Sequence, residues 1–355
     1  MIAQDHLQVY TLTLTTQGPL HIGNGLKTPR KEYIFNSRKE TVSFLNEQAF
    51  FDLLIAHGLV ELYEGFCLRR GGDLYRFLLD DCGLTWAQVA PAIRYQVSAD
   101  NALDAEHALK DICRFMRDAR GSAYVPGSSV KGALRTALLY QRIAQDQTQD
   151  RQPARSGIPE EQYFHTLHLN DRRPDDAVNS LMRGVQISDS EPVSDQTMML
   201  ALKLDGFVGG GTKPLPVCRE CVAPGTTIRF RLTLDQSILR ESITAQSILE
   251  AISAFAAYNA QVIESRFARP AGFSAPAGDG ILYMGGGAGF FGKSLIYPYL
   301  GETRGLDWTA TYLTRAFPKH YHDRDRGLGV SPRTLKYGKY RQRLYAVGAC
   351  RVEIA

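Results

Sequence analysis

The chain has 355 residues, 44% of them hydrophobic, so it can bury a substantial core and is long enough for two domains. No apolar run approaches the roughly 20 residues that a membrane helix needs, and the N-terminus lacks the pattern of a signal peptide. Six irregularly spaced cysteines argue against a disulfide framework. We therefore expect a folded cytoplasmic protein without a membrane partner. The net charge of +4 is too small to identify what it binds.

Strand patterns occur at both ends of the chain and in its middle. Residues 7–14 are rich in Val, Tyr and Thr, residues 32–35 are strand-like, and residues 227–234 and 344–354 alternate apolar and polar side chains. Helical periodicity predicts helices at 246–266 and, more weakly, at 47–57, 104–117 and 129–145.

Strands with segregated helices favour an α+β fold over a doubly wound parallel sheet. Strand–helix–strand units lie on both sides of residue 225, which suggests two related modules, 1–225 and 226–355.

A turn is predicted in Pro19-Leu-His-Ile-Gly-Asn-Gly25, directly after the first strand. Its glycines, Gly23 and Gly25, permit a tight turn in which the backbone approaches a ligand closely. His21 could act as a general base toward a ribose hydroxyl, because a neutral imidazole suits that proton transfer near pH 7. The more common role of a single histidine beside a turn is packing or hydrogen bonding.

The strongest local signal is a helix start in Pro126-Gly-Ser-Ser-Val-Lys-Gly-Ala-Leu-Arg135. Ser128 or Ser129 can cap the helix, and an apolar stripe follows. Unpaired first-turn N–H groups attract an anion, and Lys131 and Arg135 project one turn apart on the same face. The segment is a candidate phosphate site. The alternative is a capped surface helix with two solvated cations.

Gly287-Ala-Gly-Phe-Phe-Gly-Lys-Ser294 matches the P-loop pattern of nucleotide hydrolases. Only about 60 residues follow it, too few for the parallel sheet of a P-loop core, and Pro298 stands where the helix should run. A glycine-rich loop explains the segment better: Gly287 and Gly289 would pack bare backbone against an RNA strand while Lys293 contacts a phosphate.

Two further segments have competing interpretations. Cys218-Arg-Glu-Cys221 has the spacing of half a zinc site, but the chain offers no second Cys pair, so two packed thiols and no metal or cofactor are predicted. Between Arg315 and Arg343 lie nine Lys or Arg residues and two acids, with tyrosines interleaved. That segment could bind phosphates and stack bases, or it could be a solvated basic loop.

The motifs together resemble the RAMP proteins of type III CRISPR systems. The resemblance rests on the Pro19–Gly25 loop, the Val125–Arg135 segment, Arg183-Gly-Val-Gln-Ile-Ser-Asp-Ser190 and the late glycine-rich loop, and it spans about residues 7–296. Order and spacing are most similar to the family of fifth Csm subunits of type III-A effector complexes.

The resemblance implies a ferredoxin-like (RRM-like) core with insertions that binds the crRNA backbone toward the crRNA 3′ end. It implies contacts to the neighbouring backbone RAMP and small Csm subunits and no nuclease activity, with crRNA matured for antiviral defence by recruited host nucleases. A metal-independent CRISPR endoribonuclease that uses His21 is the alternative. The implied RNA contacts are His21, Gly23, Gly25, Ser128, Ser129, Lys131, Arg135, Arg183, Gly287, Gly289 and Lys293.

Overall fold

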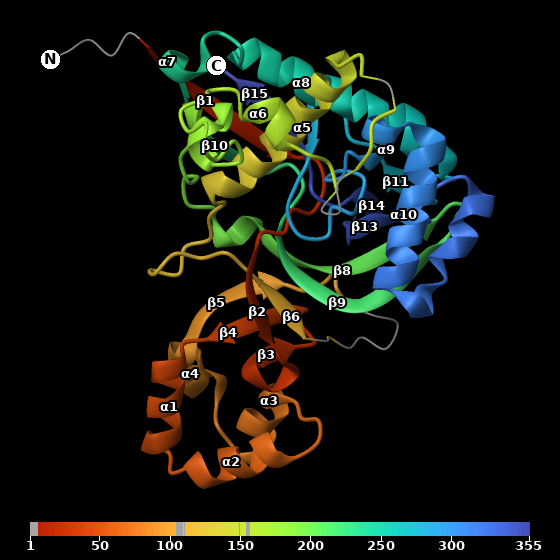
Figure 1. The fold of residues 1–355 in the computed structure, drawn as a ribbon. Coiled ribbons are helices and arrows are strands. Elements are labelled where there is room, and N and C mark those ends of the chain that lie inside the picture. Colours follow the sequence, from red (N-terminus) through yellow and green to blue (C-terminus); the bar gives the residue numbers. More distant parts are fainter. Residues whose placement is uncertain (1–5, 104–108, 110, 149, 154–156) are drawn as a thin grey trace, which may run out of the picture.

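A computed structural model describes residues 6–103, 109, 111–148, 150–153 and 157–355 of the chain (Figure 1). Its described part contains two β-sheets and a set of helices that cover them, which confirms the predicted α+β class. No helix in these ranges is both long enough and apolar enough to cross a membrane.

The first sheet is antiparallel and has the strand order β12-β15-β1-β10-β7. Its long central pair forms because alternate side chains, such as Leu12 on β1 and Phe230 and Leu232 on β10, point into the core. The strands are β1 (Leu7–Thr16), β7 (Val185–Ile187), β10 (Thr227–Asp235), β12 (Ile281–Tyr283) and β15 (Ala349–Ile354).

Two helices pack against each other and against this sheet. Helix α5 (Gly127–Gln145) packs against β7, and α8 (Ala245–Tyr258) packs against β12 and β15. Both helices bury an apolar stripe with 3- to 4-residue spacing, which in α5 consists of Val130, Leu134 and Ala137. The apolar pattern of the sequence therefore predicts both helices and the faces that they bury.

The second sheet follows the order β11-β14-β13-β8-β5-β4-β3 and has a branch in which β9 pairs with β8, β6 with β9, and β2 with β6. Its strands are β2 (Gly23–Thr28), β3 (Tyr33–Asn36), β4 (Thr41–Leu45), β5 (Ile93–Ser98), β6 (Ile112–Phe115), β8 (Met198–Phe207), β9 (Thr212–Val222), β11 (Phe273–Ser274), β13 (Thr334–Tyr340) and β14 (Arg343–Ala346).

A small lobe extends from this sheet and is visible at the bottom of Figure 1. Four short helices lie between β4 and β5 and have their own apolar core, which includes Phe50, Leu54 and Phe77. They are α1 (Glu47–Ala56), α2 (Val60–Leu68), α3 (Leu74–Arg76) and α4 (Trp86–Val89). The helix predicted at 47–57 is thus confirmed as part of this lobe.

Two predicted elements differ from the structure. The helix expected at 104–117 is wrong for residues 112–115, which form strand β6 between β2 and β9, while residues 104–108 and 110 lie outside the described part. Buried Ile112 and Phe115 are three residues apart, a spacing that fits a helix as well as a short strand. The strand expected at 344–354 is two strands, because Gly348 turns the chain with a φ of +77°.

Strands from both sides of residue 225 share each sheet. In the first sheet β1 pairs with β10 and β15, and in the second β8 pairs with β13. Each sheet therefore contains strands from both 1–225 and 226–355, and neither sheet belongs to one side of the expected boundary alone.

Candidate functional site

Three segments far apart in the sequence meet at one groove of about 660 Å³. They are the turn between β1 and β2, the first turns of α5, and the glycine-rich loop after β12. The lining residues are His21, Ile22, Gly23, Gly25, Leu26, Lys27, Cys113, Arg114, Ser129, Gly132, Ala133, Thr136, Arg219, Tyr283, Met284, Gly285, Gly286, Gly292 and Lys293. Five residues singled out from the sequence are thus brought together: His21, Gly23, Gly25, Ser129 and Lys293.

His21 connects β9 to the glycine-rich loop at the groove. His21 is 5% exposed, and its Nδ1 lies 2.7 Å from the carbonyl oxygen of Glu220 on β9. The backbone N–H of Gly286 donates to the His21 carbonyl at 2.7 Å. An added Cβ at Gly285 would lie 2.4 Å from that same oxygen, so the glycine-rich loop can approach the turn this closely only with glycine there.

The environment of the His21 ring favours its neutral form. Burial lowers the pKa of His21, and the nearby Arg219 charge acts in the same direction, against the opposing effect of the Glu220 carbonyl. A neutral ring donates from Nδ1 to Glu220, and its other nitrogen faces Gly23 and Gly286. The ring thus serves as a packing and hydrogen-bonding group between β9 and two loops.

Stability should depend on pH through His21. Because its folded pKa lies below the ordinary 6.5, the unfolded chain binds the extra proton first, and stability is lost as pH falls below about 6.5. We expect a loss of at most about 1.4 kcal/mol per pH unit from this group. Urea denaturation at pH 7.5, 6.5 and 5.5 measures it. His21→Asn should flatten the profile, whereas a variant of the exposed His57, His57→Asn, should leave it unchanged.

Four cations face the groove: Lys27, Arg114, Arg219 and Lys293. The Arg219 guanidinium makes no hydrogen bond or ion pair with any residue that the structure describes, and an added Cβ at Gly287 would lie 3.2 Å from its Nη1. Lys293 donates to the Gly285 carbonyl and thereby braces its own loop, while burial lowers the pKa of the Lys293 ammonium. Arg219 is therefore the half-buried cation best placed to accept an anionic ligand.

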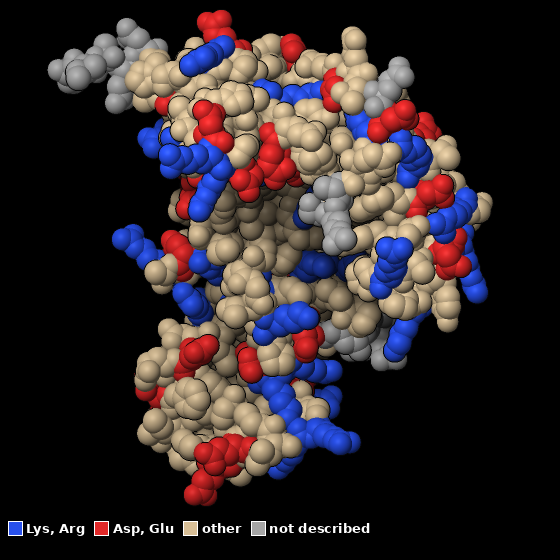
Figure 2. Space-filling view, in the orientation of Figure 1, with Lys and Arg blue, Asp and Glu red and all other residues tan. Residues whose placement is uncertain are grey.

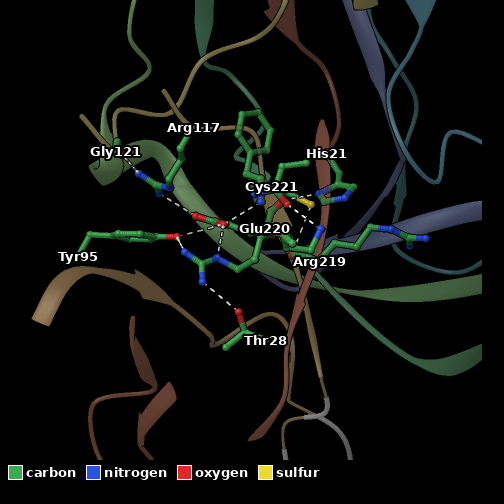
Figure 3. A network of polar contacts seen from close by, with 12 residues as sticks. His21, Thr28, Tyr95, Arg117, Gly121, Arg219, Glu220 and Cys221 are labelled. Carbon is green, nitrogen blue, oxygen red and sulfur yellow. Dashed lines mark hydrogen bonds and ion pairs between the residues drawn. The ribbon is translucent and has the colours of Figure 1, made fainter. Parts of the chain in front are cut away.

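Strand β9 directs Arg219 and Glu220 to opposite sides, because successive side chains of a strand alternate (Figure 3). Glu220 is fully buried and accepts from Arg117 at 2.7 Å, from the Phe115 N–H at 2.9 Å and from the Tyr95 hydroxyl at 3.3 Å. This network ties β9 to β6 and to β5 of the same sheet, so it fixes the strand that presents Arg219.

Arg114 belongs to both the network and the groove. Its guanidinium donates to the Thr28 hydroxyl at 2.9 Å and to the Tyr95 hydroxyl at 2.7 Å, and it lies 4.0 Å from the centre of the Phe44 ring. Arg117 lies 3.5 Å from the Tyr95 ring centre. These contacts hold Arg114 rigidly, so its charge is a fixed part of the groove.

The start of α5 differs from the prediction in one respect. The Gly127 N–H donates to the carboxylate of Asp189 at 2.9 Å, and no serine side chain caps the helix. Ser128 is exposed and Ser129 faces the groove. A carboxylate at the helix N-terminus competes with a phosphate for the same N–H groups. The prediction of a free helix end is therefore wrong, and the anion-binding character of the groove rests on its cations.

The cations of α5 lie beside the groove. Arg135 pairs with Glu160 at 2.6 Å and lines an adjoining hollow, which shares Gly132 and Lys293 with the groove. Lys131 does not line the groove, and burial together with the Arg135 charge lowers its pKa. Arg183 is exposed and donates to the Val178 carbonyl at 2.9 Å. The groove-facing positions of α5 are instead Ser129, Gly132, Ala133 and Thr136, at helical spacing.

The glycine-rich loop contains turns and no long helix. Gly285, Gly287 and Gly289 all have φ between +79° and +91°, a region that disfavours side chains. The helix after it, α9 (Ile296–Leu300), spans five residues, and β12 is antiparallel to its neighbour β15. Gly287 lies against Arg219, and Gly289 lies against Lys336. The parallel strand–loop–helix arrangement of a P-loop is therefore not what these residues form.

Cys218 and Cys221 are packed thiols on β9 itself, in two different apolar clusters. Both are buried, and burial raises the pKa of Cys218 to about 12. Among the described residues, no group of three or more His, Cys, Asp or Glu side chains is arranged to hold a metal ion.

The basic segment 315–343 is partly neutralised by internal ion pairs. Arg333 pairs with the buried Asp325 at 2.7 Å, and Lys336 pairs with Asp205 at 2.8 Å. Arg326 pairs with Asp307 at 2.9 Å. These three cations therefore help to hold α10 (Glu302–Ala316) and β13 in place.

Figure 2 shows the molecule hollowed between the small lobe and the main body, with Lys and Arg side chains around and inside the hollow. Comparisons with known proteins agree on what class of protein has this arrangement. The model of the RAMP superfamily matches residues 13–258. The chain therefore belongs to the RAMP superfamily.

Individual relatives narrow the family further. The CRISPR system protein Csm5 of Mycobacterium tuberculosis is 30% identical over 98% of each chain, and that of Streptococcus thermophilus is 28% identical over 64% of each chain. The fold matches a chain in the cryo-EM structure of a Csm–crRNA–target RNA ternary complex of a type III-A CRISPR-Cas system. That match has a TM-score of 0.63 and 17% identity and covers 97% of this chain and 100% of the other. Within the superfamily, the chain is a Csm5-type subunit of type III-A CRISPR defence.

Proposed function

We propose that the chain is a non-enzymatic subunit that holds the crRNA backbone in the groove between the His21 turn, α5 and the glycine-rich loop. The observation that carries this proposal is Arg219, a half-buried cation without a protein partner among the described residues, beside bare glycine backbone. Such a groove neutralises phosphates and does not read base edges, so binding should be salt-sensitive and largely independent of sequence.

The connectivity of the first sheet supports a ferredoxin-like core. Along the chain, the elements follow the order β1, α5, β7, β10, α8 and β15, and in the sheet the strands are arranged as β15-β1-β10-β7. This is the β-α-β-β-α-β plan of ferredoxin-like and RRM-like folds. We propose that the rest of the chain, including the small lobe, consists of insertions into that core.

The sites expected from the sequence divide into two groups in this proposal. His21, Gly23 and Gly25 line the groove, in which Ser129 and Lys293 face the RNA. Gly287 and Gly289 do not line it, but they shape the glycine-rich loop beside it and pack against Arg219 and Lys336. Ser128, Lys131, Arg135 and Arg183 would contact RNA that continues past the rim.

The partners that we propose are those of a Csm effector complex. The solved structure with the matching fold contains crRNA and target RNA. We propose that the chain sits toward the crRNA 3′ end in the cytoplasm, beside backbone RAMP and small Csm subunits, and that host nucleases trim the crRNA there.

Cleavage by the protein itself is the competing function. The burial of His21 and its bond to Glu220 support a structural role, because a general base must reach a ribose hydroxyl. Labelled repeat RNA incubated with the purified protein in EDTA should stay intact. A cleavage product that disappears in His21→Asn would establish the metal-independent endoribonuclease instead.

Charge reversal in the groove tests RNA binding directly. Arg219→Glu combined with Lys27→Glu should weaken binding of single-stranded RNA at least about tenfold at physiological salt and reduce its salt dependence. The matched control is Arg38→Glu with Lys39→Glu, an equal change in net charge in the turn between β3 and β4. Fluorescence anisotropy against salt concentration measures both. Equal RNA affinities of the two double variants would contradict the proposal.

A further inference from the structure

A second cavity lies behind the glycine-rich loop, next to the groove. Its volume is about 300 Å³, at the lower end of the ~300–1,000 Å³ typical of ligand pockets. Tyr283 and Gly292 line both the groove and this pocket, so only the loop separates them. A chemical group of an RNA chain bound in the groove could therefore enter the pocket while it stays attached to that RNA.

Aromatic rings form the walls of the pocket. They come from Phe267, Phe273, Tyr283, Phe290, Phe291 and Tyr337. The rings already pack against one another in edge-to-face pairs, with centroids 5.2 Å apart for Phe273 and Tyr337 and 5.6 Å apart for Phe290 and Phe291. Rings held in this way offer a flat ligand a pre-formed slot at little conformational cost.

Two polar groups face the pocket with bonding capacity to spare. Asn259 is 3% exposed, and its side-chain nitrogen has no hydrogen-bond partner among the described residues. It begins a π-helical turn, Asn259–Ile263, a local distortion that is frequent at functional sites. Since an unpaired buried donor costs free energy, it indicates that a ligand acceptor completes the site.

Glu264 supplies the complementary acceptor. The Tyr283 hydroxyl donates to its Oε1 at 3.0 Å, and Glu264 lines the pocket together with Arg269 and Tyr337. A carboxylate has room for more than one donor. Asn259 and Glu264 thus place a donor and an acceptor between aromatic walls, a pair that suits a flat heterocycle carrying both kinds of group.

We propose that this pocket receives a nucleobase with an exocyclic amine, turned out of the RNA that lies in the groove. Adenine, guanine and cytosine each offer an amine to Glu264 and a ring or carbonyl acceptor to Asn259. Uracil fits less well, because its single ring N–H lies between two carbonyl oxygens that would face the carboxylate. The inference rests on the proposed function and adds a base preference to a groove that otherwise reads only backbone.

Oligouridine RNAs that carry one adenosine test the preference. The full-length protein should bind them about tenfold more tightly than plain oligouridine, the difference that one base–aromatic stack supplies. Asn259→Leu and Glu264→Gln should abolish this preference and leave the affinity for oligouridine unchanged. The matched control is Gln261→Leu, the same amide-to-alkyl change at an exposed position in the same turn, which should keep it.

Thermal melting separates binding from folding. Asn259→Leu removes an unpartnered buried amide, so without RNA it should melt at or above the temperature of the unaltered protein. Equal affinity for both RNAs overturns the inference. So does Asn259-dependent binding of free adenosine monophosphate without any RNA preference, since the pocket would then take a free nucleotide. If Arg219→Glu with Lys27→Glu weakens RNA binding while the pocket variants change nothing, the proposed function stands and only the base pocket is lost.

Discussion

Glu220→Gln is expected to lower the free energy of unfolding by about 3–5 kcal/mol, the usual cost of removing one partner of a buried ion pair. Glu220 is fully buried, and Arg117, its closest cationic partner, has a side chain that is 7% exposed. The substitution leaves the Arg117 charge buried without its main counter-ion, and Arg114 also loses a nearby carboxylate at 3.7 Å. Because domains are stable by only about 5–15 kcal/mol, this loss is a large part of the total.

The control is the second carboxylate on the same arginine. Asp195 accepts from Arg117 at 2.7 Å, but its side chain is 46% exposed, so Asp195→Asn should cost less than about 1 kcal/mol. Urea denaturation of both variants measures the difference. If both variants lost a similarly small amount of unfolding free energy, the network would not be what holds β9. The position of Arg219 would then need another explanation.

Local patterns were enough to predict much of the fold. Alternation at 227–234 and helical spacing at 246–266 each report one buried face, and the structure confirms both elements. Residues 112–115 could not be assigned in this way, because β6 exists through its pairing with β2 and β9. The β9 partner lies 106 residues further along, as in the pair Ile112 and Cys218, and no local spacing encodes that contact.

The site shows the same division between local and distant information. The His21 turn and the glycine-rich loop are visible in the sequence, because turns need glycine wherever backbone approaches backbone. Arg219 lies between Cys218 and Cys221, and the sequence pattern there indicates only the two thiols. Its importance depends on Glu220 being buried against Arg117, 103 residues away.

The N-terminal cap of α5 likewise depends on a contact that is distant in the sequence. Capping was expected from Ser128 or Ser129, which are adjacent in sequence to the helix start. The actual cap is Asp189, 62 residues away, brought there by the pairing of β7 with β10. The preference of a helix N-terminus for an acceptor was correctly anticipated, but the acceptor came from the folded chain.

The same substitution at two glycines of α5 should have effects of opposite sign. At Gly127, an added Cβ would lie 2.2 Å from the Ile187 carbonyl oxygen and 2.4 Å from that of Ser188. These are backbone atoms of β7 and the segment after it, so α5 must move and its bond to Asp189 must weaken. We expect Gly127→Ala to destabilise the protein by about 1–3 kcal/mol, the range of overpacked cores.

At Gly132, nothing lies within 4 Å of an added Cβ, and the position is exposed within the same helix. Gly132→Ala should therefore stabilise the protein by up to about 1 kcal/mol, the helix-propensity difference. Urea denaturation of the two variants gives the signs. A loss at both positions would show that α5 tolerates no added methyl group, and a gain at both would show that α5 does not depend on close contact with β7. Opposite signs would establish that the start of α5 is held by the backbone beside β7, which is what sets its groove-facing residues.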